Sequence, residues 1–75
     1  MDFEDRLKKL QTTFTYALSN SVTAKARYLA LVDQPGATPA AVALAKMTWQ
    51  QFEARKASLV AQMVALEELE AEALA

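Results

Sequence analysis

The strongest break in the chain is segment 33–39, DQPGATP, which holds the single glycine and both prolines. Pro-Gly is typical of a turn, and Thr38-Pro39 is typical of an N-cap followed by a proline in the first helical turn. The segment divides the 75 residues into two arms of similar length. It therefore favours two long elements joined by one turn.

Both arms carry apolar or small residues at alternating spacings of three and four, the pattern of a helix that packs along its whole length. In the first arm these are Phe3, Leu7, Leu10, Phe14, Ala17, Ser21, Ala24, Tyr28 and Leu31. In the second they are Val42, Ala45, Trp49, Phe52, Lys56, Leu59, Met63 and Leu66. The pattern predicts a helix over about 3–33, capped by Asp2, a turn at 34–38 and a helix over about 39–72.

A connection of about five residues joins two helices as antiparallel neighbours. Folding the arms about the turn pairs positions whose numbers sum to about 72, which sets Trp49 and Phe52 against the small residues Ala24 and Ser21. Large side chains opposite small ones can interdigitate. The predicted fold class is all-α, a single domain over 1–75 formed by an antiparallel two-helix hairpin.

Segment 12–23 is the weakest part of the first helix, because its four threonines, two serines and Asn20 have poor helix propensity. We expect tertiary packing to keep the helix continuous, with the hydroxyls facing solvent. The alternative is a kink or break near Ser19-Asn20-Ser21, which would make the N-terminal segment a separate short helix.

The composition argues against catalysis. The chain has no cysteine and no histidine, so thiol nucleophiles, thiolate zinc sites and imidazole bases are excluded. One glycine cannot form a phosphate-binding loop, and a lone hairpin offers no cavity in which a carboxyl pKa could be raised. We expect no enzyme, catalytic residue, metal or cofactor, and we interpret Lys56 as reaching solvent or a carboxylate such as Glu53 or Asp5.

The charges of the chain nearly cancel, at a formal net charge of −1, which does not favour nucleic acid as a partner. The acidic start MDFED is unlike a signal peptide, so we expect a cytoplasmic protein. The longest apolar stretch, 57–66, is far shorter than the ~20 residues of a membrane span, so no membrane insertion is expected. The acidic segment 67–72 opposes the helix dipole and favours fraying of that end.

The sequence has more apolar residues than one seam between two helices can bury. On a helical wheel, four apolar residues face away from the seam: Tyr16 in the first arm and Leu44, Met47 and Leu69 in the second. Three more widen the apolar stripe of the first arm to one side: Leu18, Val22 and Leu29. This excess predicts a surface for a protein partner or a second copy. The candidate partner-binding residues are Tyr16, Leu44, Met47 and Val64.

The acidic, apolar start MDFEDRL, the Pro-Gly turn, the segment WQQFE at 49–53 and the final apolar run resemble the small co-chaperones of type III secretion needle subunits, the E-component proteins of the YscE, PscE and EscE type. The similarity lies in length, architecture and a few positions. It implies a cytoplasmic hairpin that pairs with a tetratricopeptide-like chaperone and keeps the needle subunit soluble before export, a role in virulence.

Two other functions fit the same pattern. Needle-type structural subunits are themselves helical hairpins with a proline-containing turn, although their C-terminal segment is not acidic. A generic homodimer could close into a four-helix bundle or coiled coil over the excess apolar surface. Each is a protein-protein interaction function, and none needs a cofactor.

Overall fold

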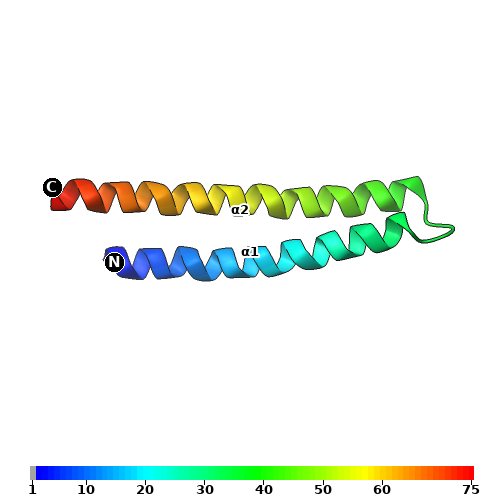
Figure 1. The fold of residues 1–75 in the computed structure, drawn as a ribbon, viewed down its shortest axis with the longest axis horizontal. Coiled ribbons are helices and arrows are strands. Elements are labelled where there is room, and N and C mark those ends of the chain that lie inside the picture. The colour runs from blue at the N-terminus through cyan, green and yellow to red at the C-terminus, as the bar shows by residue number, and fades with distance from the viewer. Residues whose placement is uncertain (1) are drawn as a thin grey trace.

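The computed structural model describes residues 2–75, which form two helices, α1 (Phe3–Val32) and α2 (Pro39–Leu74). The helices run antiparallel and side by side along their length, and the two chain ends lie at the same end of the molecule, where α2 extends beyond the start of α1 (Figure 1). The hairpin measures 59 × 15 × 15 Å. It confirms the predicted all-α fold.

Each helix begins at a residue whose side chain caps it. Asp2 accepts a 2.9 Å hydrogen bond from the backbone N–H of Asp5, and Thr38 accepts one of 3.1 Å from that of Ala41. Pro39 occupies the first turn of α2, where its missing N–H costs nothing. In the turn, Gly36 has a φ of +86°, a left-handed conformation that favours glycine.

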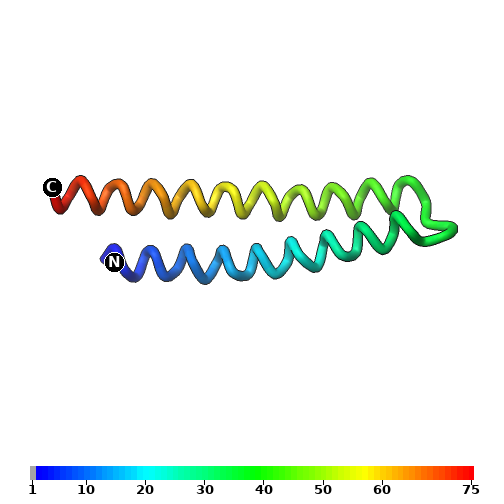
Figure 2. The backbone as a smooth tube through the Cα atoms, in the orientation of Figure 1, coloured from blue at the N-terminus to red at the C-terminus, as the bar shows by residue number. Residues whose placement is uncertain are grey.

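The first helix is continuous through the threonine-rich segment (Figure 2), so the alternative of a break near Ser19-Asn20-Ser21 is wrong. The hydroxyls of Thr13 and Thr15 donate to the backbone carbonyls of Lys9 and Gln11, four residues earlier, at 2.9 and 3.0 Å. These bonds satisfy the hydroxyls without breaking the helix. The helix ends at Val32, one residue before the expected limit.

The second helix continues to Leu74, two residues beyond the expected limit, so the acidic segment 67–72 is helical in this structure. Unfavourable charge at a helix C-terminus amounts to a few tenths of a kcal/mol per residue, which is too little to outweigh the good helix propensity of its Glu, Leu and Ala residues.

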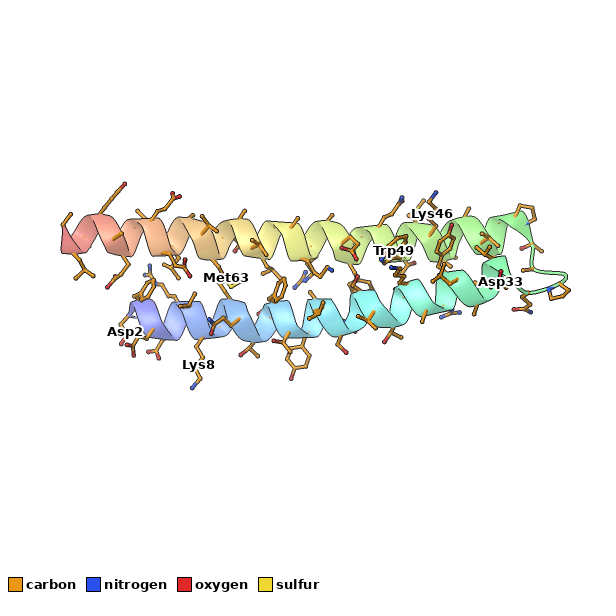
Figure 3. All side chains as sticks on the ribbon, in the orientation of Figure 1. Asp2, Lys8, Asp33, Lys46, Trp49 and Met63 are labelled. Atoms are coloured by element: carbon orange, nitrogen blue, oxygen red, sulfur yellow. The ribbon has the colours of Figure 1, made fainter. Side chains whose placement is uncertain are left out.

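The seam between the helices is formed by the two predicted stripes, all of whose residues are buried or half-buried. The fully buried positions among the described residues are Ala17, Ser21, Ala24, Ala45 and Leu59. Figure 3 shows Trp49 and Met63 between the helices, whereas Lys8 and Lys46 point away from them. Four of the five buried residues are small, so the helices approach each other with little core between them.

The observed cross-seam pairs lie close to the expected register. Ser21 donates a hydrogen bond of 2.8 Å to Glu53, the residue next to the expected Phe52. Trp49 stacks on Tyr28, with ring centroids 5.8 Å apart and planes 17° apart. These pairs sum to 74 and 77 rather than 72. The sums are larger because each side chain points toward the N-terminus of its own helix. In an antiparallel pair, a side chain therefore contacts a residue slightly later in the partner helix than the one opposite its own Cα atom.

Candidate protein-binding surfaces

The hairpin exposes two long flanks, one on each side of the seam. In a packed helix pair, residues seven apart lie on the same flank. Contacts across the seam identify which residues of α1 and α2 share a flank. One flank contains a cluster of polar and aromatic side chains, and the other contains two hollows.

The first flank is organised around Glu53. Its Oε1 accepts hydrogen bonds from the Ser21 hydroxyl at 2.8 Å and the Trp49 indole N–H at 3.0 Å, and its Oε2 lies 3.0 Å from the Lys56 ammonium. The predicted ion pair of Lys56 with a carboxylate is therefore confirmed, with Glu53 as the partner. The hydrogen bonds from Lys56, Ser21 and Trp49 lower the pKa of Glu53.

The lowered pKa makes Glu53 a poor proton acceptor, because its carboxylate is already stabilised by three donors. The Lys25 ammonium lies 5.6 Å from the centroid of the Trp49 ring, in a cation–π contact. The cluster links α1 to α2 through polar and aromatic contacts at the middle of the molecule. Its contacts form a structural cross-link between the two helices.

Aliphatic side chains border this cluster at both ends. Leu18 and Val32 are each seven residues from Lys25, and Val60 is seven from Glu53, so all three lie on the same flank. Val22, Leu29 and Val64 each lie four residues, or one helical turn, after a residue of this flank: Leu18, Lys25 and Val60 respectively. We call the set the aliphatic flank: Leu18, Val22, Leu29, Val32, Val60 and Val64, which are 42–62% exposed.

The opposite flank has two hollows with apolar floors. The hollow near the turn is lined by Ala24, Arg27, Leu31, Ala41, Leu44, Ala45 and Thr48. The hollow near the open end is lined by Arg6, Lys9, Leu10, Gln62, Ala65, Leu66 and Leu69. Arg55 is seven residues from both Thr48 and Gln62, so it lies between the two hollows. We call this surface the basic groove.

The structure does not bring the four candidate partner-binding residues together, although all four are exposed, by 47–69%. Leu44 lines the hollow near the turn. Tyr16 is seven residues from Lys9 and so lies at the margin of the same groove. Met47 faces outward from α2, and Val64 belongs to the aliphatic flank. The four residues therefore mark three different surfaces.

Sequence reasoning missed the alignment of cations in the basic groove. Along the chain the two signs of charge nearly balance, and the cations separate from the carboxylates only when the residues are grouped by flank. The signal was present, because Arg6 and Arg27 are separated by three heptads. Assigning Arg55 to the same groove required the contacts that show which flank of α2 adjoins which flank of α1.

Over residues 2–75, no group of three or more acidic side chains is placed to hold a metal ion. In the same range, neither helix has a stretch that combines the length and the apolar character needed to cross a bilayer. Comparison of the chain with protein-family models, curated proteins and solved structures gives no significant match. The surfaces themselves therefore carry the functional argument.

Proposed function

We propose that this protein acts by binding other proteins and not by catalysis, as a co-chaperone of a type III secretion system. In this role it pairs with a tetratricopeptide-like chaperone, and the pair keeps the needle subunit soluble before export. The observation that carries the proposal is the aliphatic flank, where large apolar side chains of both helices are exposed.

The balance between buried and exposed apolar surface supports a binding role. Among the described residues, Leu59 is the only large aliphatic side chain that is fully buried, at 6% exposure. Chains of this size bury a small share of their surface and are often stabilised by a partner, a metal or disulfides. Because the chain has no cysteine and so no disulfide, a protein partner that covers the aliphatic flank would add stability to that of the helix seam.

The resemblance to the E-component co-chaperones gives the proposal its specific form. Tetratricopeptide arrays stack pairs of helices into a superhelix with an extended binding surface. A narrow rod of 59 × 15 × 15 Å with one aliphatic flank suits lengthwise packing against such helices. The cytoplasmic location is part of the same proposal, since the needle subunit must be protected before export.

The test is affinity capture of the full chain from its native cytoplasm, followed by mass spectrometry. We expect to recover a helical-repeat chaperone together with a needle subunit, and recovery of neither would overturn the proposal. Val22→Asp, on the aliphatic flank, should reduce recovery about ten-fold or more, because a carboxylate would be buried without a partner. The matched control is Ala26→Asp, four residues away on the outer side of α1.

Sedimentation of the purified chain separates this function from the two alternatives. A weakly associating species is expected for a co-chaperone without its partner. A dimer that persists at all concentrations would instead support a four-helix bundle, and a filament would support a needle-type subunit. Either result would contradict the proposal.

A further inference from the structure

The basic groove concentrates positive charge on a chain whose net charge is −1. Arg27 borders the hollow near the turn, and Arg6 and Lys9 border the hollow near the open end. Spacing of seven residues from Thr48 and from Gln62 places Arg55 between the two hollows. Half of the chain's eight basic residues are therefore on one flank. The carboxylates with matching spacing lie at the helix ends: Asp2, seven residues before Lys9, caps the start of α1, and Glu72, seven residues beyond Ala65, lies at the end of α2.

Among residues 2–75, none of these cations lies within 4.0 Å of a carboxylate, and the ion pair that meets this limit is that of Lys56 with Glu53, on the other flank. Arg6, Lys9, Arg27 and Arg55 are all exposed. Because their charges project beside apolar floors, the groove offers contacts for apolar and acidic groups at the same time.

The dimensions of the groove restrict what can occupy it. Leu44 and Ala65, which line different hollows, are separated by 21 residues of α2, or about 30 Å at 1.5 Å per residue. An occupant that fills both hollows must be long and narrow. A third helix of about 20 residues or more, lying between α1 and α2, has this shape and can place apolar residues in both hollows.

We propose that the basic groove binds an acidic amphipathic helix of a partner protein. The apolar face of that helix fills the two hollows, and its acidic residues pair with Arg27, Arg55, Arg6 and Lys9. This inference rests on the proposed function, namely that the chain binds proteins, and it names the chemistry of one partner segment. The aliphatic flank remains free for a second contact.

Charge excludes the simplest competing occupant. A second copy that used the same groove would place four cations opposite four cations, and like charges across an interface are unfavourable. A nucleic acid would satisfy the cations but would leave Leu31, Leu44, Leu66 and Leu69 without apolar contacts. An acidic helix satisfies both parts of the surface.

The test uses the full chain and a defined probe. The probe is a synthetic 24-residue helical peptide with leucines at alternating three- and four-residue spacings and glutamates beside them. Its counterpart has lysine in place of every glutamate. Binding is followed by fluorescence anisotropy of a labelled peptide, from low to high salt. We expect the acidic peptide to bind, with affinity falling as salt rises, and the basic peptide not to bind.

Charge reversal locates the site. The double variant Arg27→Glu with Arg55→Glu should weaken binding of the acidic peptide about ten-fold or more. The matched control is Lys8→Glu with Lys46→Glu, which makes the same change in net charge at two lysines that point away from the partner helix (Figure 3). The control should stay within about two-fold of the parent chain. Circular dichroism checks that all variants remain helical.

Equal binding of the two peptides, equal loss in the two double variants, or tighter binding of a 20-base-pair DNA duplex than of the acidic peptide would each overturn the inference. The captured native partner distinguishes this failure from failure of the proposed function. If the partner binds the Arg27→Glu, Arg55→Glu variant with the same affinity as the parent chain, the proposed function stands, but the groove is not the site where that partner binds. If the peptide binds but no secretion partner is captured, the groove stands and the co-chaperone function falls.

Discussion

The hydroxyl of Ser21 donates a 2.8 Å hydrogen bond to the carboxylate of Glu53, which joins the middle of α1 to the middle of α2. Ser21 is 2% exposed and lies between the buried residues Ala17 and Ala24. A polar side chain at this position of a helix pair is buried only because it has a partner across the seam. The bond is one of the contacts that hold the two helices in their observed register.

Ser21→Ala should lower the free energy of unfolding by about 0.5–1.5 kcal/mol, since one interhelical hydrogen bond is lost. Glu53 keeps its contacts with Lys56 and Trp49, so the effect stays modest. Urea denaturation followed by circular dichroism measures the change. Ser19→Ala, at an exposed position of α1, is the control and should change stability by less than about 0.5 kcal/mol. Equal effects in the two variants would contradict a stabilising role for the hydrogen bond between Ser21 and Glu53.

Acid should weaken the hairpin through Glu53. Its pKa is lowered in the folded state, so its contribution to stability is present above the unfolded value, near 4.5, and is lost as the pH falls through the lower folded value. When the pH is lowered below about 4.5, we expect the Tm of the chain to decrease. Glu53→Gln should reduce this dependence of Tm on pH. Trp49, whose indole N–H donates to Glu53, reports the same transition by fluorescence. An identical pH profile in Glu53→Gln would disprove the assignment.

Leu59 is the large side chain most buried among the described residues, at 6% exposure. Leu59→Ala should cost about 2–5 kcal/mol, a large part of the stability of so small a domain, because it removes apolar burial and leaves a cavity. The neighbouring control is Val60→Ala, at 44% exposure, which should cost far less. Thermal unfolding of the two variants, compared side by side, checks the difference. Similar melting temperatures would show that the seam does not dominate stability.

Gly36 occupies a left-handed conformation, with φ of +86°, in the turn between the helices. A Cβ at this position would meet nothing within 4 Å, so the cost of Gly36→Ala comes from the backbone alone. We expect a loss of about 1–2 kcal/mol, measured by urea denaturation. Gln34→Ala in the same turn is the control. If Gly36→Ala instead stabilises the chain, the turn must have adopted a right-handed conformation.

The two stripes of the seam followed from spacing alone, from Phe3 to Leu31 and from Val42 to Leu66. Spacing of three and four identifies which face of a helix is buried, so this part of the fold can be predicted from the sequence. The candidate surface was less accessible. Tyr16, Leu44, Met47 and Val64 are exposed as expected, but a wheel drawn for each helix separately could not show that they lie on three surfaces.

The sequence by itself determined that the chain forms two helices joined at Gly36, because turn residues and periodicity are local properties. Only the tertiary structure decided that Ser21 donates its hydrogen bond to Glu53, and that Arg27 of α1 and Thr48 of α2 line one hollow. Successive helical residues are rotated by about 100°, so a small change in the offset or rotation of one helix exchanges the partners across the seam. That offset is set by how all the seam side chains pack together, and no single segment of the sequence contains it.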